Sequence, residues 1–325
     1  LRKDLFAKIA LFCDIDQEAV IQAVDAETVY DIPVLLQEQG LDQIALERLG
    51  LSCKVADMTE WKKFCQRYKE CQETLDIALV GKYVELKDAY LSVMEAICHA
   101  ATHYKIKAHV KWIGAAQLTE ENIAAELSGM SGILIPGGFG ERGVAGKMLA
   151  AHFAREHKIP CLAIGLGMQA ALIDIAKNVA GLAEANSTEF IEDTPQPILW
   201  IPPKELDPEM PEVDTMRLGA YPCALQEDSL LAQVYDHQKV VYERHRHRYE
   251  INPAYLPDLQ KAGVVFSGIS PDGTFVEAME LPNHPWFIGC QFLPEFQSRP
   301  LRPHPLFKGF LGAALDYAGK DCAWK

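Results

Sequence analysis

The chain has 325 residues, 49% of them hydrophobic, which is enough for one large or two medium domains with a substantial core. Its net charge of −14 repels phosphate groups at long range, so we expect no general binding to nucleic acid or to anionic membranes. The nine cysteines form no CxxC pair and lie mostly in apolar segments, and no apolar run approaches the roughly 20 residues that cross a bilayer. We therefore expect a globular, cytoplasmic protein.

The first 51 residues contain three apolar runs that we interpret as strands, at 9–13, 19–21 and 28–36, before a helical pattern. A unit of this size is too small to bury much surface alone, and the chain begins with leucine rather than methionine. We expect it to be the end of a domain whose body lies upstream. Aromatic residues at helical spacing then predict a helical linker over 52–75.

From residue 76 onward, strands are predicted to alternate with helices. Expected strands lie at 77–81, 106–113, 132–135 and 160–164, and expected helices at 88–101, 120–127, 143–157 and 166–179. This alternation predicts an α/β fold with an open, mostly parallel sheet and helices on both faces. Functional groups are then expected at the carboxyl ends of the strands.

The second half has a more mixed pattern. Strand-like runs, separated by proline and glycine, lie at 196–201, 215–225, 239–251, 264–269, 274–281 and 286–292. A helix is expected from about 305 to 317, and the acidic, proline-rich stretch 202–214 is predicted to be a mobile loop.

The stretch Pro160–Gln169 is an apolar run that ends on Gly165 and passes at once into a helical pattern. Such a junction resembles a nucleophile elbow, in which a strained turn exposes one side chain while the next backbone N–H helps to form an oxyanion hole. Glycine tolerates the strained backbone but carries no attacking group. The sequence therefore predicts the geometry of a catalytic site without its reactive atom.

Six short motifs occur in a characteristic order along the chain. They are GGFG at 137–140, LGMQ at 166–169, NSTEF at 186–190, TMRLG at 215–219, ERHRHRYE at 243–250 and PEF at 294–296. Together they resemble CTP synthase over nearly the whole chain. The resemblance implies a class I glutamine amidotransferase domain over 76–325, the end of an ammonia-ligase domain over 1–51, and a part in the amination of UTP to CTP.

The resemblance also implies a catalytic triad: a cysteine at the elbow apex, a histidine as its base, and a glutamate two residues later that orients the imidazole. In this chain the apex is Gly165, the base position is Leu293, and only Glu295 is kept. We therefore expect no glutaminase activity. The residues at positions 165 and 293 fit a natural loss of the cysteine and the histidine, and they also fit two engineered substitutions.

A glutamine pocket is implied by the same motifs. The resemblance assigns backbone contacts and the oxyanion hole to Gly137, Gly138 and Leu166, and glutamine binding to Gln169, Glu189 and Arg248. A carboxylate and an arginine suit the two charged groups of a free amino acid. Each residue also has a structural interpretation: the glycine pair could serve a turn with positive φ, Glu189 could cap a turn, and Arg248 could form a surface ion pair.

Other nucleophiles or bases are less well placed in the sequence. Cys161 and Cys290 lie in apolar strands, where a buried structural thiol is expected. His245 and His247 alternate with arginines, which favours surface or ion-paired roles, and no ligand spacing predicts a metal site.

The chain has no phosphate-binding loop, so we expect no cofactor in it, whereas the complete family enzyme uses ATP, Mg²⁺ and GTP. Val213-Asp214 stands where the family usually has a glycine pair in a loop that responds to GTP, which puts GTP activation in doubt.

The possible partners of the protein are glutamine and further copies of the chain, which could assemble through the upstream domain or in a larger assembly. The functional alternatives are a structural or regulatory pseudoenzyme, a glutamine sensor, a hydrolase with a relocated nucleophile, and an ammonia-dependent CTP synthase if an intact ligase lies upstream.

Overall fold

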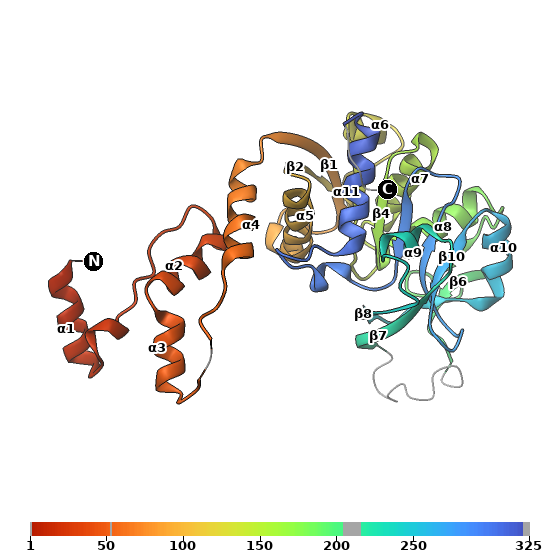
Figure 1. Ribbon diagram of the computed structural model, residues 1–325. Coiled ribbons are helices and arrows are strands. Elements are labelled where there is room, and N and C mark those ends of the chain that lie inside the picture. Colours follow the sequence, from red (N-terminus) through yellow and green to blue (C-terminus); the bar gives the residue numbers. More distant parts are fainter. Residues whose placement is uncertain (1, 53, 204–215, 321–325) are drawn as a thin grey trace. The chain divides into compact units, whose positions relative to one another are not determined.

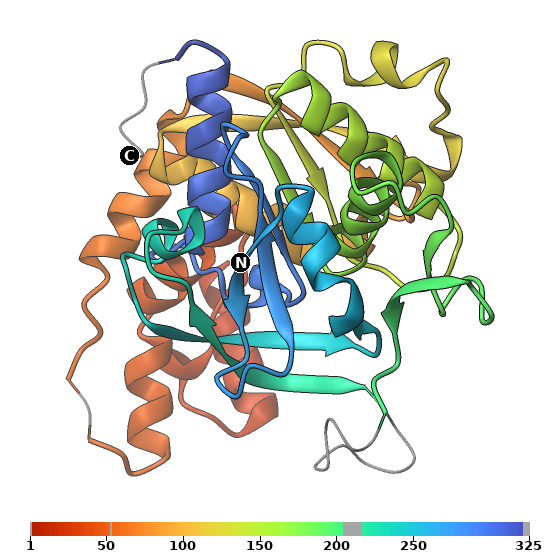
Figure 2. The same cartoon turned by 90° about the vertical axis from the view of Figure 1, so that its right-hand side faces the viewer.

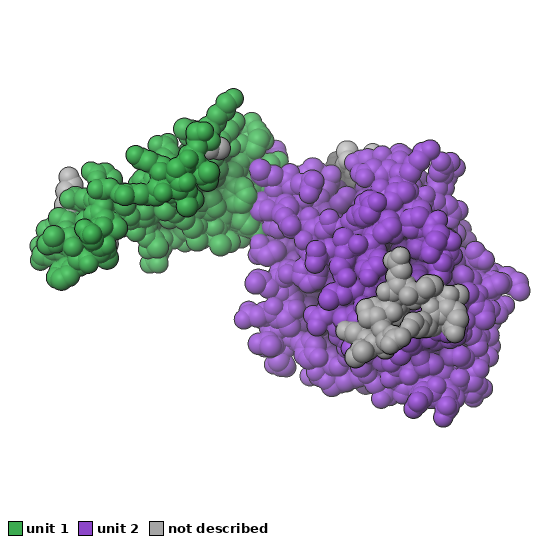
Figure 3. Space-filling model, turned by 90° about the horizontal axis from the view of Figure 1, so that it is seen from below, with its two compact units in different colours: residues 1–71 green, residues 72–325 purple. Residues whose placement is uncertain are grey.

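The computed structural model describes residues 2–52, 54–203 and 216–320. The chain divides into two compact units, residues 1–71 and residues 72–325, which Figure 3 distinguishes by colour.

All regular elements that the structure describes in the first unit are helical. Its elements are α1 (Lys3–Cys13), η1 (Gln17–Ala19), η2 (Val29–Asp31), α2 (Ile32–Glu38), α3 (Leu41–Arg48) and α4 (Thr59–Glu70). The strands predicted at 9–13, 19–21 and 28–36 are therefore wrong. A lone strand leaves its backbone groups unpaired, whereas a helix pairs them internally, so short apolar runs without a partner strand favour the helix.

The second unit is built on a sheet of nine strands in the part of the chain that the structure describes, in the order β2-β1-β3-β4-β12-β11-β10-β7-β8. The parallel half comprises β1 (Glu73–Gly81), β2 (Ile106–Gly114), β3 (Gly132–Ile135), β4 (Cys161–Ile164) and β12 (Phe287–Cys290). The antiparallel half comprises β7 (Arg217–Leu225), β8 (Val240–His247), β10 (Val265–Ile269) and β11 (Val276–Glu280). A small second sheet holds β5 (Ala185–Ser187), β6 (Gln196–Trp200) and β9 (Glu250–Ile251).

Helices cover both faces of the large sheet, as Figures 1 and 2 show, and the predicted fold class is confirmed. One face carries α5 (Leu91–His103) and α11 (Pro305–Tyr317), and the other carries α7 (Val144–His157) and α8 (Leu166–Asn178). The shorter helical elements are η3 (Lys87–Tyr90), η4 (Ala115–Gln117), α6 (Ile123–Leu127), α9 (Leu230–Val234), η6 (Pro253–Tyr255), α10 (Leu256–Lys261) and η7 (Pro294–Gln297).

Strand β1 shows why its sequence forms a central strand. Ile77 and Leu79 belong to the core beneath α5 and α11, while Ala78 and Val80 belong to the core beneath α7 and α8. Successive side chains of a strand point to opposite faces, so a strand covered on both faces must be apolar throughout. Strands β3, β4 and β12 are likewise buried along their whole length.

These three strands are neighbours and run parallel, so their carboxyl ends meet at one edge of the sheet. The loops that follow them contain Gly137, Gly165 and Leu293. The fold thus brings together three positions that are far apart in the sequence. Most of the loop predicted at 202–214 lies outside the described residues.

Candidate functional site

The junction between β4 and α8 has the strained backbone that the sequence predicts. Gly165 has φ 52° and ψ −116°, a conformation that favours glycine. Its N–H donates to the carbonyl of Cys290 at 2.7 Å, and its own carbonyl accepts from the N–H of Gln169 at 3.0 Å. The turn is therefore fixed to β12 on one side and to the first turn of α8 on the other.

The apex position faces both of the other loops. A Cβ atom built on Gly165 would lie 3.7 Å from Cα of Gly137, 3.8 Å from the carbonyl oxygen of Gln291 and 3.9 Å from Cδ2 of Leu293. These are ordinary van der Waals distances. The structure therefore places the positions assigned to the nucleophile, the base and the glycine loop next to one another.

Glu295 lies in η7, just beyond Leu293. Its Oε2 atom is buried and has no hydrogen-bond partner in the described part of the chain. Burial, assisted by the nearby charge of Glu243, raises the pKa of Glu295 to about 7. A buried carboxyl group without a partner destabilises a protein, and an imidazole is one group that could pair with it.

The glycine loop is held by a buried lysine that sequence reasoning missed. Lys147 on α7 is 1% exposed, and its Nζ donates to the carbonyls of Pro136 and Gly137. Burial, with a contribution from Lys82, lowers the pKa of Lys147 to about 7. The lysine interrupts a run of small and apolar residues on α7, which is the signal that could have revealed it.

The interpretation of the glycine pair as a turn with positive φ is wrong. Neither Gly137 nor Gly138 has positive φ. A Cβ on Gly138 would instead lie 3.5 Å from Cδ2 of Leu166 and 3.6 Å from Nζ of Lys147. These are ordinary van der Waals distances, so neither the backbone conformation nor close packing requires glycine at position 138.

Of the predicted ligand-binding residues, Glu189 contacts the glycine loop directly. Oε1 of Glu189 accepts from the N–H of Gly140 at 2.6 Å. Arg248 is exposed in the turn between β8 and β9. Burial and Glu189 raise the pKa of Tyr249, while Arg248 lowers it, so both charges lie close to this tyrosine. Their roles in binding stay predictions.

Gln169 is only 3% exposed. Its Nε2 donates to the carbonyl of Tyr249 at 3.2 Å and to Oε1 of Gln291 at 3.1 Å. Gln291, which the sequence motifs did not single out, therefore connects Gln169 on α8 with the segment between β8 and β9.

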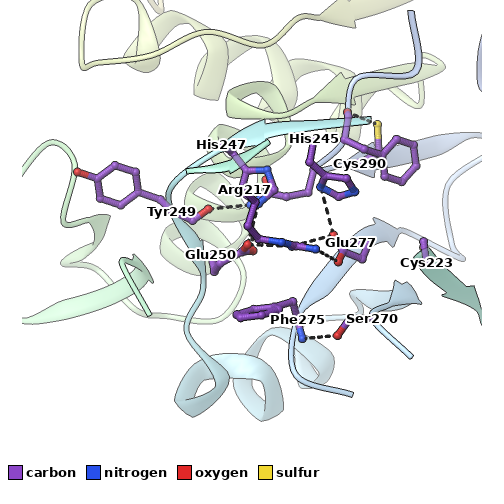
Figure 4. Close-up of polar contacts among 12 residues, drawn as sticks. Arg217, Cys223, His245, His247, Tyr249, Glu250, Ser270, Phe275, Glu277 and Cys290 are labelled. Carbon is purple, nitrogen blue, oxygen red and sulfur yellow. Dashed lines mark hydrogen bonds and ion pairs between the residues drawn. The ribbon is translucent and has the colours of Figure 1, made fainter. Parts of the chain in front are cut away.

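A buried cluster of charges lies beneath this segment, as Figure 4 shows. The guanidinium of Arg217 donates to Glu250 at 2.9 Å and to Glu277 at 2.7 Å. His247 donates from Nε2 to Glu250 at 2.7 Å. Burial, together with His247 and Arg217, lowers the pKa of His245 to about 2, so this ring is neutral. The surface role considered for the two histidines is thus wrong, whereas the ion-paired role fits His247.

The two cysteines considered as replacement nucleophiles are buried, as predicted. Burial raises the pKa of the Cys161 thiol, and burial with Glu295 and Glu243 raises that of Cys290. The Cys290 thiol lies 3.5 Å from the carbonyl oxygen of Phe292. Since the thiolate is the reactive form, neither residue has the properties of a catalytic cysteine.

Over the described ranges, no group of three or more histidine, cysteine or acidic residues is arranged to hold a metal ion. Within the same ranges, no helix has both the length and the apolar character needed to cross a membrane. Val213-Asp214, the pair on which the doubt about GTP activation rests, lies outside the residues that the structure describes.

Comparisons with known proteins agree with this architecture. Residues 85–313 match the family model of class I glutamine amidotransferases, and residues 1–51 match the model of the CTP synthase N-terminus. The chain is 52% identical to CTP synthase of Bacillus velezensis and 51% identical to that of Bacillus subtilis. In both comparisons the match covers 98% of this chain but only 59% of the relative.

Among solved structures, the glutaminase domain of Trypanosoma brucei CTPS with bound acivicin is 37% identical and superimposes with a TM-score of 0.71. That match covers 77% of this chain and 96% of the trypanosome domain. The motifs, the fold and the relatives agree, and the chain belongs to the class I glutamine amidotransferases and, within them, to the CTP synthase family.

Proposed function

We propose that this chain is part of a CTP synthase-like protein whose amidotransferase domain does not hydrolyse glutamine. The observation that carries the proposal is Gly165 at the elbow apex with Leu293 beside it, since neither residue can attack an amide or accept a proton. Removing the nucleophile or the base of a triad typically lowers turnover on the order of a million-fold.

Ammonia release from glutamine tests this proposal. We expect a rate below about one hundredth of that of the Bacillus subtilis relative in the same assay. An electrophilic glutamine analogue should leave the mass of the protein unchanged. A comparable rate, or a covalent adduct on Cys161 or Cys290, would support a relocated nucleophile instead.

A second proposal is that the site still binds glutamine and acts as a sensor. It is supported by the loop at Gly137 and Gly138, which Lys147 holds, and by Glu189, whose side chain contacts that loop. Gln169 and Arg248 are the further polar groups that the resemblance assigns to glutamine binding. Calorimetry should detect glutamine binding, and the absence of heat at millimolar glutamine would remove this proposal.

For the complete protein, we propose a cytoplasmic enzyme or regulator that assembles through its upstream domain. We divide the present chain into the end of a ligase domain (1–51), a linker (52–75) and the amidotransferase-like domain (76–325). If an intact ligase domain lies upstream, free ammonia should still aminate UTP while glutamine should not. An assay of the complete protein with each nitrogen source distinguishes this activity from a purely structural or regulatory role.

A further inference from the structure

A chain of side-chain amides links the buried charge cluster to the elbow. At its inner end, Glu250 accepts from Arg217 and His247 through Oε1 (Figure 4). At its outer end is Gln169, in the first turn of α8, four residues after Gly165. Gln291 lies between them.

Each step of this chain has a fixed hydrogen-bond direction. Nε2 of Gln291 faces two acceptors, the carbonyl of Tyr249 at 2.8 Å and Oε2 of Glu250 at 3.4 Å. Glu250 only accepts because it is ionised: burial alone would raise its pKa, but His247 and Arg217 outweigh burial and lower it. The amide nitrogen of Gln291 must therefore point inward, and its Oε1 must point toward Gln169.

The same reasoning fixes Gln169. Its Nε2 lies between Oε1 of Gln291 at 3.1 Å and the carbonyl of Tyr249 at 3.2 Å, which are both acceptors. Its own Oε1 accepts no hydrogen bond from the described residues. Because the amide nitrogen faces both acceptors, this oxygen points away from Gln291 and from the carbonyl of Tyr249.

We propose that Gln291, anchored by Glu250, is a positioning residue that turns the carbonyl oxygen of Gln169 outward and so selects a ligand with a free ammonium group. This inference rests on the proposal that the site binds a free amino acid. An outward carbonyl accepts a hydrogen bond from an ammonium group, whereas a reversed amide would present its NH₂ group to the same cation.

The chain offers a matched pair of variants. Glu250→Gln and Glu277→Gln each remove one charge from a buried carboxylate paired with Arg217, but only the Glu250 side chain contacts Gln291. In Glu250→Gln, Arg217 and His247 hold the new amide oxygen, so its NH₂ group faces the nitrogen of Gln291 and disfavours the native orientation. Gln291→Met removes the link without changing the charge cluster.

Two ligands separate ammonium recognition from general loss of binding: L-glutamine, and glutaramate, which lacks the α-ammonium group. We expect Glu250→Gln and Gln291→Met to weaken glutamine binding about tenfold more than Glu277→Gln does, and to leave glutaramate binding nearly unchanged. In a Gln169→Met background, Glu250→Gln should have no further effect on glutamine. Equal losses for both ligands, or equal effects of the two glutamate variants, would overturn the inference.

Neutron diffraction from deuterated crystals provides a readout that does not depend on binding. It should show the Gln169 nitrogen facing Gln291 in the unsubstituted protein and in Glu277→Gln, and a reversed or mixed orientation in Glu250→Gln. A reversed amide in the unsubstituted protein would refute the positioning role. Native amides in a protein that binds no glutamine would refute only the proposed binding function. Thermal melting establishes that each variant is folded.

Discussion

Leu293 lies beside Gly165: its Cδ2 is 3.9 Å from the position that a Cβ on the glycine would occupy. It is also 3.5 Å from the corresponding position on Gly137. An apolar side chain thus fills the place where the family resemblance assigns the general base, directly beside the place assigned to the nucleophile. Compared with the triad that the resemblance implies, positions 165 and 293 carry neither a cysteine nor a histidine, while hydrogen bonds hold the backbone turn at Gly165 in place.

We therefore predict that Gly165→Cys combined with Leu293→His produces glutaminase activity. The new Cβ at 165 has room, although a residue other than glycine at φ 52° carries strain of about 1–3 kcal/mol. The new imidazole could pair with the carboxyl of Glu295, whose Oε2 lacks a partner among the described residues. Because triad residues act as a unit, the double variant should exceed either single variant by at least about a hundredfold in ammonia release.

The matched control is Gly165→Ser combined with Leu293→His, which has a similar volume and strain but no thiol. Only the cysteine variant should gain mass from an electrophilic glutamine analogue. A folded double variant that is no faster than the single variants would show that the backbone is not competent for catalysis.

The elements that bring this site together could be predicted from the sequence, because their signals are local. The strand ending at Ile164 and the helix beginning at Leu166 follow from an apolar run and the helical pattern after it. The assignment of triad positions to Gly165 and Leu293 stays a prediction from the motifs. The burial of His245 and His247 could also have been predicted, from the alternation of residues along strand β8. Strand β8 alternates strictly between exposed and buried residues, which places its arginines outside and these histidines inside.

Two other features depend on contacts between distant residues and have no local signal. The burial of Lys147 depends on its reach to the carbonyls after β3, and the amide chain depends on residues 169, 249, 250 and 291 meeting in space. The strands predicted before residue 51 are wrong although their local signal is present. Apolar runs were present, but no partner strand exists in the described part of the first unit.

Glu295→Gln should stabilise the protein more at pH 8 than at pH 5. Burial raises the pKa of Glu295 from its ordinary value of 4.5 to about 7, so between these values the folded state binds more protons than the unfolded state. The stability of the unsubstituted protein then falls as the pH rises through this window, whereas glutamine does not titrate. Between pH 5 and 8 the difference in unfolding free energy should move in favour of the variant by about 1–3 kcal/mol.

Urea denaturation at both pH values measures this difference. Glu227→Gln, the same substitution at an exposed glutamate, is the control. The same pH dependence in both variants would mean that the buried carboxyl of Glu295 is not its source.

Lys147→Met should have the opposite pH dependence. Burial lowers the pKa of Lys147 from 10.5 to about 7, so between these values the unfolded state binds more protons and the unsubstituted protein gains stability as the pH rises. Methionine removes this gain, so the variant should lose on the order of 2 kcal/mol relative to the unsubstituted protein between pH 7 and 9. Lys82→Met, at a less buried lysine that donates to the carbonyl of Phe139, should retain most of the pH dependence, because burial is the larger cause of the lowered pKa of Lys147. Parallel stability curves for Lys147→Met and the unsubstituted protein would contradict a buried, neutral amine.

The glycines of the site should differ sharply in their tolerance to alanine. A Cβ on Gly167 would lie 2.1 Å from the carbonyl oxygen of Ile135, so α8 and β3 would have to separate. A Cβ on Gly137 meets nothing closer than 3.5 Å, and this residue does not have positive φ. Gly167→Ala should therefore cost more than about 3 kcal/mol of stability or yield insoluble protein, whereas Gly137→Ala should change stability by less than about 1 kcal/mol. Soluble yield and urea denaturation measure both effects, and equal tolerance at the two positions would mean that the close packing of α8 on β3 is not as the structure places it.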